Sequence, residues 1–172
     1  MFCASLLTSA KVQEFIRDSF KRKLDALQIS TALSKAGYSN EDRAAIMDYM
    51  ALVPKIKDKF GSGELLCDKL ALEQSTAQDI GRWKANLWTA VIGGDAGSAT
   101  VHDLCCGMGG DSFFIPSSFK IVGVDLDENR LAMYSHNMEV LGKTAFTLCA
   151  DVREVANATF FTIDPARRAQ EG

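Results

Sequence analysis

A chain of 172 residues has room for one domain or two small ones, and 47% hydrophobic with 24% charged residues is typical of a globular protein with a buried core. The net charge of −3 excludes a global basic signature of nucleic-acid binding, although a local patch could still supply one. No apolar run approaches the roughly 18 residues needed to cross a membrane, so we expect a soluble, cytoplasmic protein without membrane contact.

Cysteine and histidine usage argues against a metal site. There are five cysteines and two histidines, and no two cysteines have C-x-x-C spacing. The adjacent pair Cys105 and Cys106 would point to opposite faces of a strand, which suits a disulfide poorly. We expect reduced, mostly buried thiols and no metal.

The first half of the chain has helical periodicity. Apolar residues recur at three- and four-residue steps from Val12 to Leu27 and again from Ile80 to Val91. Ser39 is placed to cap a helix, and Pro54 is expected to limit its extension. We therefore predict an N-terminal helical region over residues 1–93.

From residue 99 the pattern changes to alternating strands and helices. Strands are predicted at Thr100–Cys105, Lys120–Asp125, Ala145–Ala150 and Thr159–Ile163, with a clear helix from Glu128 to Leu141. Such alternation predicts an α/β fold with a parallel sheet over residues 99–172. Ligands of these sheets bind at the carboxyl ends of the strands, where four acidic residues of this chain lie.

A glycine turn follows the first predicted strand. Gly107 and Gly109 allow a sharp bend and a close approach to a ligand, although an ordinary strand-to-helix turn would use them equally well. A dinucleotide site would read G-x-G-x-x-G, but the third position here is Ser112. The acid Asp103, four residues before Gly107, suits a cationic ligand and suits a pyrophosphate badly.

The acids that end the next two strands suit a nucleoside. Asp125 is placed to accept hydrogen bonds from both ribose hydroxyls, with Asp127 as the alternative if it is not a helix cap. Asp151, followed by Val152, could accept a proton from an adenine amino group, or it could cap the short segment that follows.

The sequence D-P-A-R-R at 164–168 is the candidate substrate side. Asp164 could align an acceptor nitrogen, and Pro165 would stiffen the turn. Arg167 or Arg168 could contact a phosphate or carboxylate, or could simply be solvated. Alignment and polarity carry most of the catalysis of a displacement reaction, so these residue types in this position suit group transfer.

These segments resemble motifs one to four of class I S-adenosylmethionine-dependent methyltransferases, which have a Rossmann-like fold. The segments are 103–111, 122–127, 149–152 and 163–168. The E-Q-S-T sequence at 73–76 and the D-P-A-R-R sequence are similar to those of a prokaryotic group with a helical N-terminal region and a C-terminal THUMP-like domain.

The resemblance implies roles for individual residues. S-adenosylmethionine would be bound by Asp103, Gly107, Gly109, Asp125, Asp151 and Val152. Asp164, Pro165 and Arg167 would act on the substrate side, and Glu73, Gln74 and Thr76 would line the entrance. The THUMP link and a distant likeness to cap-guanine N2 methyltransferases imply RNA as the substrate, with a base nitrogen as acceptor.

Class I methyltransferases have seven strands, whereas four are predicted here. We therefore expect a partial sheet and a truncated chain, with an exposed strand edge that invites self-association. The alternatives are a non-catalytic module that keeps the cofactor fold and binds RNA or a partner, and, less favoured, a nicotinamide-dependent oxidoreductase.

Overall fold

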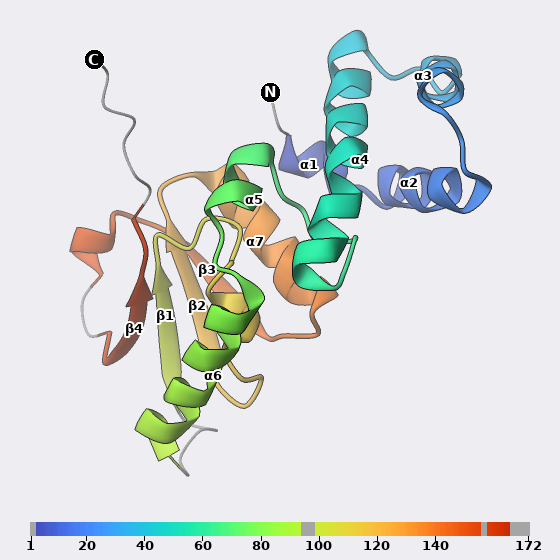
Figure 1. Cartoon of the computed structure of the whole chain (residues 1–172). Helices are drawn as coiled ribbons and strands as arrows, with labels where there is room; N and C mark the ends of the chain where they lie inside the picture. Colours follow the sequence, from blue (N-terminus) through green and yellow to red (C-terminus); the bar gives the residue numbers. More distant parts are fainter. Residues whose placement is uncertain (1–2, 94–98, 156–157, 166–172) are drawn as a thin grey trace, which may run out of the picture. The chain divides into compact units, whose positions relative to one another are not determined.

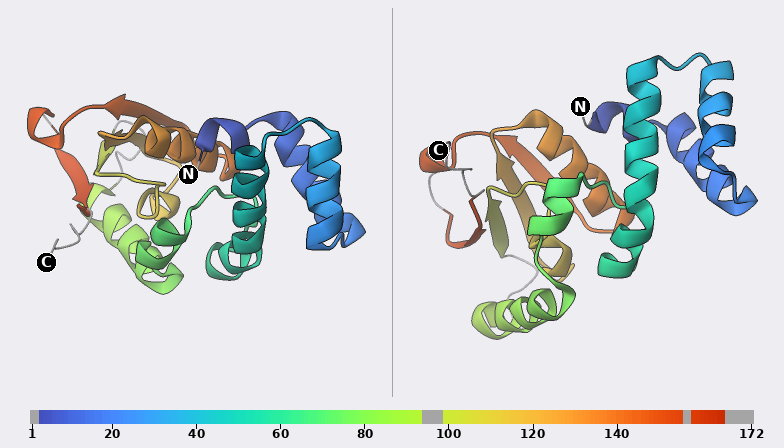
Figure 2. Two further views of the ribbon diagram at one scale, coloured as in Figure 1. Left: turned by 90° about the horizontal axis from the view of Figure 1, so that it is seen from above. Right: turned by 45° about the horizontal axis from the view of Figure 1, so that its top comes forward.

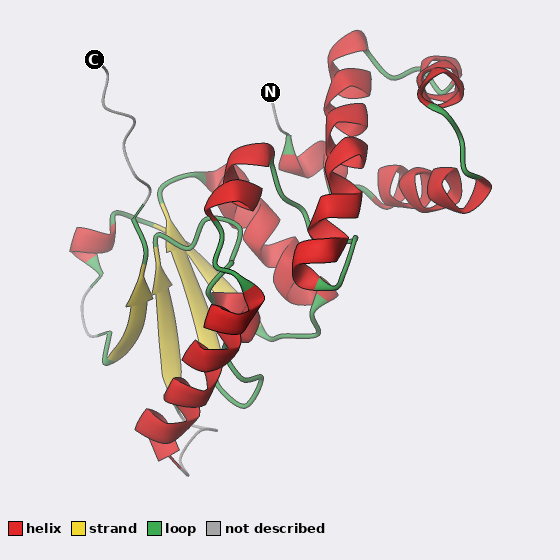
Figure 3. Ribbon diagram, in the orientation of Figure 1, coloured by secondary structure: helices red, strands yellow, loops and turns green. Residues whose placement is uncertain are grey.

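A computed structural model describes residues 3–93, 99–155 and 158–165. Within it the chain divides into two compact units, Met1–Glu73 and Gln74–Gly172 (Figure 1). The first unit is helical and the second contains the sheet, as Figure 3 shows by colour. No helix among the described residues is long and apolar enough to cross a membrane.

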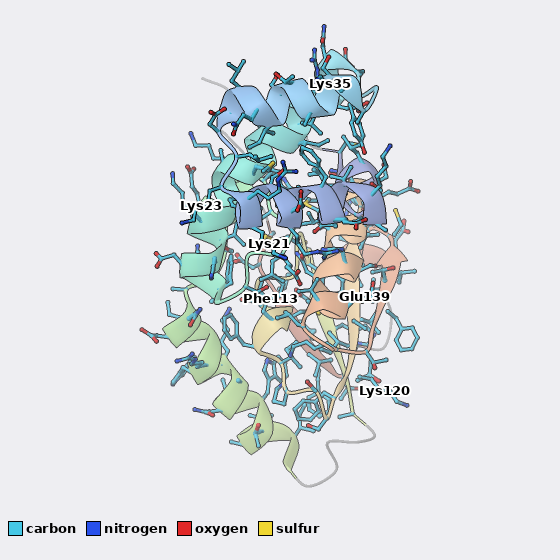
Figure 4. All side chains as sticks on the ribbon, turned by 90° about the vertical axis from the view of Figure 1, so that its right-hand side faces the viewer. Lys21, Lys23, Lys35, Phe113, Lys120 and Glu139 are labelled. Atoms are coloured by element: carbon cyan, nitrogen blue, oxygen red, sulfur yellow. The ribbon has the colours of Figure 1, made fainter. Side chains whose placement is uncertain are left out.

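The first unit consists of short helices followed by one long one. They are α1 (Ala4–Leu7), α2 (Ala10–Arg22), α3 (Ala26–Lys35) and α4 (Asn40–Phe60), with α5 (Lys69–Gln74) at the boundary of the unit. Ser39 caps α4 as predicted, since its side chain accepts the Asp42 N–H. Lys21, Lys23 and Lys35 are exposed at the ends of α2 and α3 (Figure 4).

The expected effect of Pro54 on α4 was wrong. The helix continues through Pro54 to Phe60 and ends at Gly61, which has a φ of 81°. Proline removes one N–H donor from a helix interior, but buried residues on both sides, Met50 and Ile56, hold α4 in place. Packing therefore outweighs the local preference.

The second unit is built on a parallel sheet in the order β3-β2-β1-β4. The strands are β1 (Thr100–Leu104), β2 (Lys120–Asp125), β3 (Ala145–Cys149) and β4 (Phe160–Ile163), close to the predicted ranges. The helices are α6 (Gln78–Ile92) and α7 (Glu128–Val140), with single 3-10 turns η2 (Ser112–Phe114) and η3 (Val152–Glu154). The prediction of an α/β fold with four parallel strands is thus confirmed, and Figure 2 shows the strands side by side in two further views.

The two faces of the sheet differ. On one face, β1 and β2 bury Val101, Asp103 and Ile121 beneath α7 and η2. On the other, alternate residues of the outer strands are about half exposed: Phe146 (59%), Leu148 (45%), Phe161 (50%) and Ile163 (49%). The candidate functional site lies at the carboxyl ends of the strands.

Candidate functional site at the carboxyl ends of the strands

The turn after β1 is held in left-handed backbone conformations. Cys105, Gly107 and Gly109 have φ angles of 63°, 54° and 96°. Glycine adopts such angles without strain, but cysteine does not. A Cβ added at Gly107 would meet nothing within 4 Å, so the turn has open space at this residue, where a ligand could approach.

Residues of helix α7 hold this turn in position. A Cβ at Gly109 would come within 2.8 Å of Met138 Cε, and the φ of 96° strains any other residue, so glycine is favoured here. The buried Asn137 side chain donates from Nδ2 to the Met108 carbonyl at 2.9 Å. The position of the turn therefore depends on α7 as much as on the glycines.

Asp103 lies beneath the turn and is only 3% exposed. Its Oδ2 accepts a hydrogen bond from Ser112 Oγ at 2.6 Å, and Ser112 is also hydrogen-bonded to Tyr134 Oη at 2.9 Å. Burial raises the pKa of Asp103 to about 7, although the Ser112 hydrogen bond opposes that shift. Ser112, at the third position where a dinucleotide turn would have glycine, is thus part of a buried polar network.

Asp125, at the end of β2, supports the turn directly. Its Oδ2 accepts the Gly107 N–H at 2.9 Å, and its Oδ1 accepts the Asp127 N–H at 3.1 Å. Asp127 caps α7, because its Oδ1 accepts the N–H groups of Asn129 and Arg130. Capping was the alternative to a ribose contact for Asp127. Because the cap is observed, Asp125 remains the candidate for the ribose contact.

Asp151 follows β3 by two residues and forms an ion pair with Arg153. Hydrogen bonds from the Arg153 side chain and backbone lower the pKa of Asp151 to about 2. The Arg153 N–H bond also caps η3, whose first residue is the partly exposed Val152. The capping alternative for Asp151 is therefore observed, and its contact with adenine stays a prediction.

Asp164 and Pro165 are exposed just after β4, and Arg167 lies outside the described residues. Asp103, Asp125, Asp151 and Asp164 lie at or just after the carboxyl ends of four neighbouring parallel strands, on the side of the sheet where the turn at Cys105 begins. Their charges act on the Cys105 thiol. Burial raises the pKa of this thiol first, and the charges of Asp125, Asp103, Asp151 and Asp164 raise it further. No three His, Cys, Asp or Glu side chains in the described ranges are placed to hold a metal ion.

A second cluster was not predicted as a group, although one of its members, Thr76, was predicted to line the entrance of the site. The Asp111 carboxylate accepts hydrogen bonds from Lys84 Nζ at 2.7 and 2.8 Å, from Thr76 Oγ1 at 2.6 Å and from Thr162 Oγ1 at 2.9 Å. A lysine in the middle of the otherwise apolar stripe of α6 was the available signal, because a part-buried lysine needs an anionic partner. Which acid it would meet could not be known without the fold.

Together these features define a Rossmann-like class of protein. A parallel sheet in this order, with a glycine turn after β1 and an acid at the end of β2, is typical of nucleotide- or nucleoside-binding folds. The acids at the strand ends suit a ligand with cationic groups and disfavour a pyrophosphate.

Comparison with known proteins shows which Rossmann-like proteins this chain is similar to. A family model described as RNA cap guanine-N2 methyltransferase matches residues 98–164. Two proteins from strains of Mycobacterium tuberculosis, each named as an uncharacterized S-adenosylmethionine-dependent methyltransferase, are 33% identical to this chain over 111 residues. The match covers 63% of this chain but only 29% of the length of each relative. The chain is thus similar to methyltransferases in the region of its sheet.

Proposed function

We propose that the second unit binds S-adenosylmethionine and is part of a methyltransferase. The observation that carries this proposal is that Asp103, Asp125, Asp151 and Asp164 lie at or just after the carboxyl ends of four neighbouring parallel strands, where Asp125 accepts the Gly107 N–H of the glycine turn. S-adenosylmethionine is a nucleoside with a cationic sulfonium and a cationic amino group, and it would supply an electrophilic methyl group. The similarity to named methyltransferases supports the same cofactor.

Each residue has a distinct task in this proposal. Gly107 and Gly109 shape the turn so that its backbone approaches the ligand, and Asp125 accepts hydrogen bonds from the ribose hydroxyls. Asp151 and Val152 border the adenine, and Asp103, in its ionised form, favours the cationic end of the ligand electrostatically from beneath the turn. Asp164 and Pro165 would border the acceptor, where Asp164 would hold the attacking nitrogen in line. The task proposed for Arg167 is contact with a phosphate or carboxylate of the substrate.

The cofactor assignment is tested by calorimetric titration with S-adenosylhomocysteine. We expect Asp125→Asn to weaken binding at least about tenfold, since each lost factor of ten corresponds to about 1.4 kcal/mol, the scale of one hydrogen bond to a charged group. Glu139→Ala, which removes an exposed acid of α7 (Figure 4), is the control and should bind normally. Equal affinities for all three chains would contradict the proposed ribose contact.

We propose further that the acceptor is a base nitrogen of RNA, and that the whole protein belongs to the prokaryotic group with the D-P-A-R-R motif. The match to a family described as acting on RNA cap guanine supports this substrate class. The test is incubation with labelled S-adenosylmethionine and total bacterial RNA, followed by analysis of methylated nucleosides. Asp164→Ala should retain cofactor binding and abolish labelling; if labelling persists, Asp164 does not hold the acceptor.

We also propose that the outer edge of β4 mediates self-association. β4 is the end strand of the described sheet, and its Phe161 and Ile163 are half exposed. Phe161→Lys should lower any dimer fraction measured by analytical ultracentrifugation. A monomer at all concentrations would rule out this contact.

A further inference from the structure

Asp111 lies directly after the glycine turn, and its carboxylate joins three segments of the second unit. Thr76 precedes α6, Lys84 lies in the second turn of α6, and Thr162 lies on β4. The Asp111 side chain is only 8% exposed, whereas that of Lys84 is 32% exposed. Four hydrogen bonds therefore converge on one nearly buried carboxylate.

The carboxylate is ionised in this setting. Burial by itself would raise the pKa of Asp111, but the hydrogen bonds from Lys84, Thr76 and Thr162 outweigh burial and lower it. A buried ion pair is weak evidence for a gain in stability, because desolvation offsets most of the attraction. Its directional bonds do, however, fix the relative positions of the segments that supply them.

Those segments carry the two sides of the proposed site. Thr162 stands opposite Asp103 in the β1–β4 register and lies two residues before Asp164. Gly110, next to Asp111, is so close to the segment before α6 that an added Cβ would lie 3.2 Å from Ser75 Cβ. The carboxylate thus links the cofactor turn, the segment before α6 and the strand that ends at the substrate-side acid.

We propose that Asp111 is a positioning residue that locks the glycine turn to α6 and to β4. Its role is to hold the cofactor side and the substrate side of the site in one geometry, and it touches neither ligand itself. This inference rests on the proposed function, because its readout is the affinity for the proposed cofactor. Misplacing reacting groups by about 1 Å can cost about a hundredfold in catalytic rate, and the contacts of the turn with the cofactor depend on the same alignment.

The experiment compares S-adenosylhomocysteine affinity across four variants of the chain at a temperature well below their melting transitions. Asp111→Asn keeps the shape but loses the charge, and Lys84→Met removes the ion pair. Both are expected to weaken binding roughly tenfold or more while the circular dichroism spectrum stays native. Lys84→Arg restores a cation that can bond to a carboxylate and should bind like the unsubstituted chain. Glu139→Gln, an exposed acid of α7, is the matched control and should also bind normally.

The outcomes separate this inference from the proposed function. Weak binding by Asp111→Asn and Lys84→Met, with rescue in Lys84→Arg, supports the positioning role. Unchanged affinity in both overturns it while leaving the cofactor site intact. If the folded, unsubstituted chain does not bind, the proposed function fails and this inference fails with it.

A milder pair of variants covers the case in which Asp111→Asn does not fold. Thr162→Val removes one hydrogen bond to Asp111 without leaving a buried charge unpaired. It should still weaken binding a few-fold, because β4 then loses its hydrogen bond to the residue that follows the glycine turn. Thr147→Val, an exposed threonine of β3, is its control. Equal affinity of Thr162→Val and the unsubstituted chain overturns the link to β4.

Discussion

Asp103 makes the stability of the folded chain depend on pH. Its pKa of about 7 in the folded chain compares with 3.8 ordinarily, so between these values the folded state binds a proton that the unfolded state has released. The stability contributed by the protonated acid is fully present below about pH 4 and is lost as the pH rises through about 7. We expect the free energy of unfolding to fall by up to about 1.4 kcal/mol per pH unit across this range.

Asp103→Asn tests this pH dependence. Asparagine stays neutral and still accepts from Ser112, so its stability should change less with pH than that of the unsubstituted chain. Urea denaturation of both chains at pH 5, 6, 7 and 8 measures the difference. Parallel curves would show that Asp103 stays ionised or is solvated.

Cys105 has a left-handed conformation that most side chains avoid. A non-glycine residue in this conformation lowers stability by about 1–2 kcal/mol. Replacing it with glycine removes that strain but lowers stability by about 0.5–1 kcal/mol, because glycine loses more backbone entropy on folding. Cys105→Gly should therefore leave the free energy of unfolding unchanged or raise it by up to about 1.5 kcal/mol. Cys105→Val, which places a branched side chain at a φ of 63°, should lower it by more than about 1 kcal/mol. If thermal melting finds the valine variant as stable as the glycine variant, the strain is absent.

At the scale of elements, α6 packs closely against η2 at Gly81. A Cβ at Gly81 would lie 2.0 Å from Phe114 Cδ2, so α6 approaches η2 only because residue 81 is glycine. Gly81→Ala improves helix propensity by about 1 kcal/mol, but overpacking should cost more and give a net loss of about 1–2 kcal/mol. Asn86→Ala, an exposed change on the same helix, should have little effect. Adding Phe114→Ala should remove the loss of stability caused by Gly81→Ala. If the double variant instead loses as much stability in melting experiments as the two single variants together, the contact is refuted.

The strands and α7 were predictable because their signals are local. β2 matches its predicted range, and β1, β3, β4 and α7 differ from theirs by a residue at an end. The packing of α6 was not predictable in the same way. Its apolar residues Ile80, Trp83, Leu87 and Val91 are about half exposed or more, and its inward face instead carries Gly81 and Lys84. Periodicity marks an apolar face, but only the fold shows which face packs.

At the scale of the whole molecule, the site is assembled from distant parts of the sequence. The acids after each strand could be predicted, because parallel strands end at one edge of a sheet. The supporting contacts could not: Asp111 meets Thr162 across 51 residues, and Asn137 meets Met108 across 29. Those contacts require the strand order, which local patterns do not determine. Helix α6, predicted as part of the N-terminal helical region, lies in the compact unit of the sheet.

The central claim is that acids at the ends of four strands and a glycine turn form a site for S-adenosylmethionine and its demethylated product. The most direct measurement is the melting temperature of the unsubstituted chain with S-adenosylhomocysteine and, separately, with NAD. At a hundredfold excess over its dissociation constant, a ligand of the folded state adds about 2.7 kcal/mol of stability. We predict a rise in melting temperature with S-adenosylhomocysteine and none with NAD. A rise with NAD alone, or with neither ligand in a folded chain, would contradict the claim.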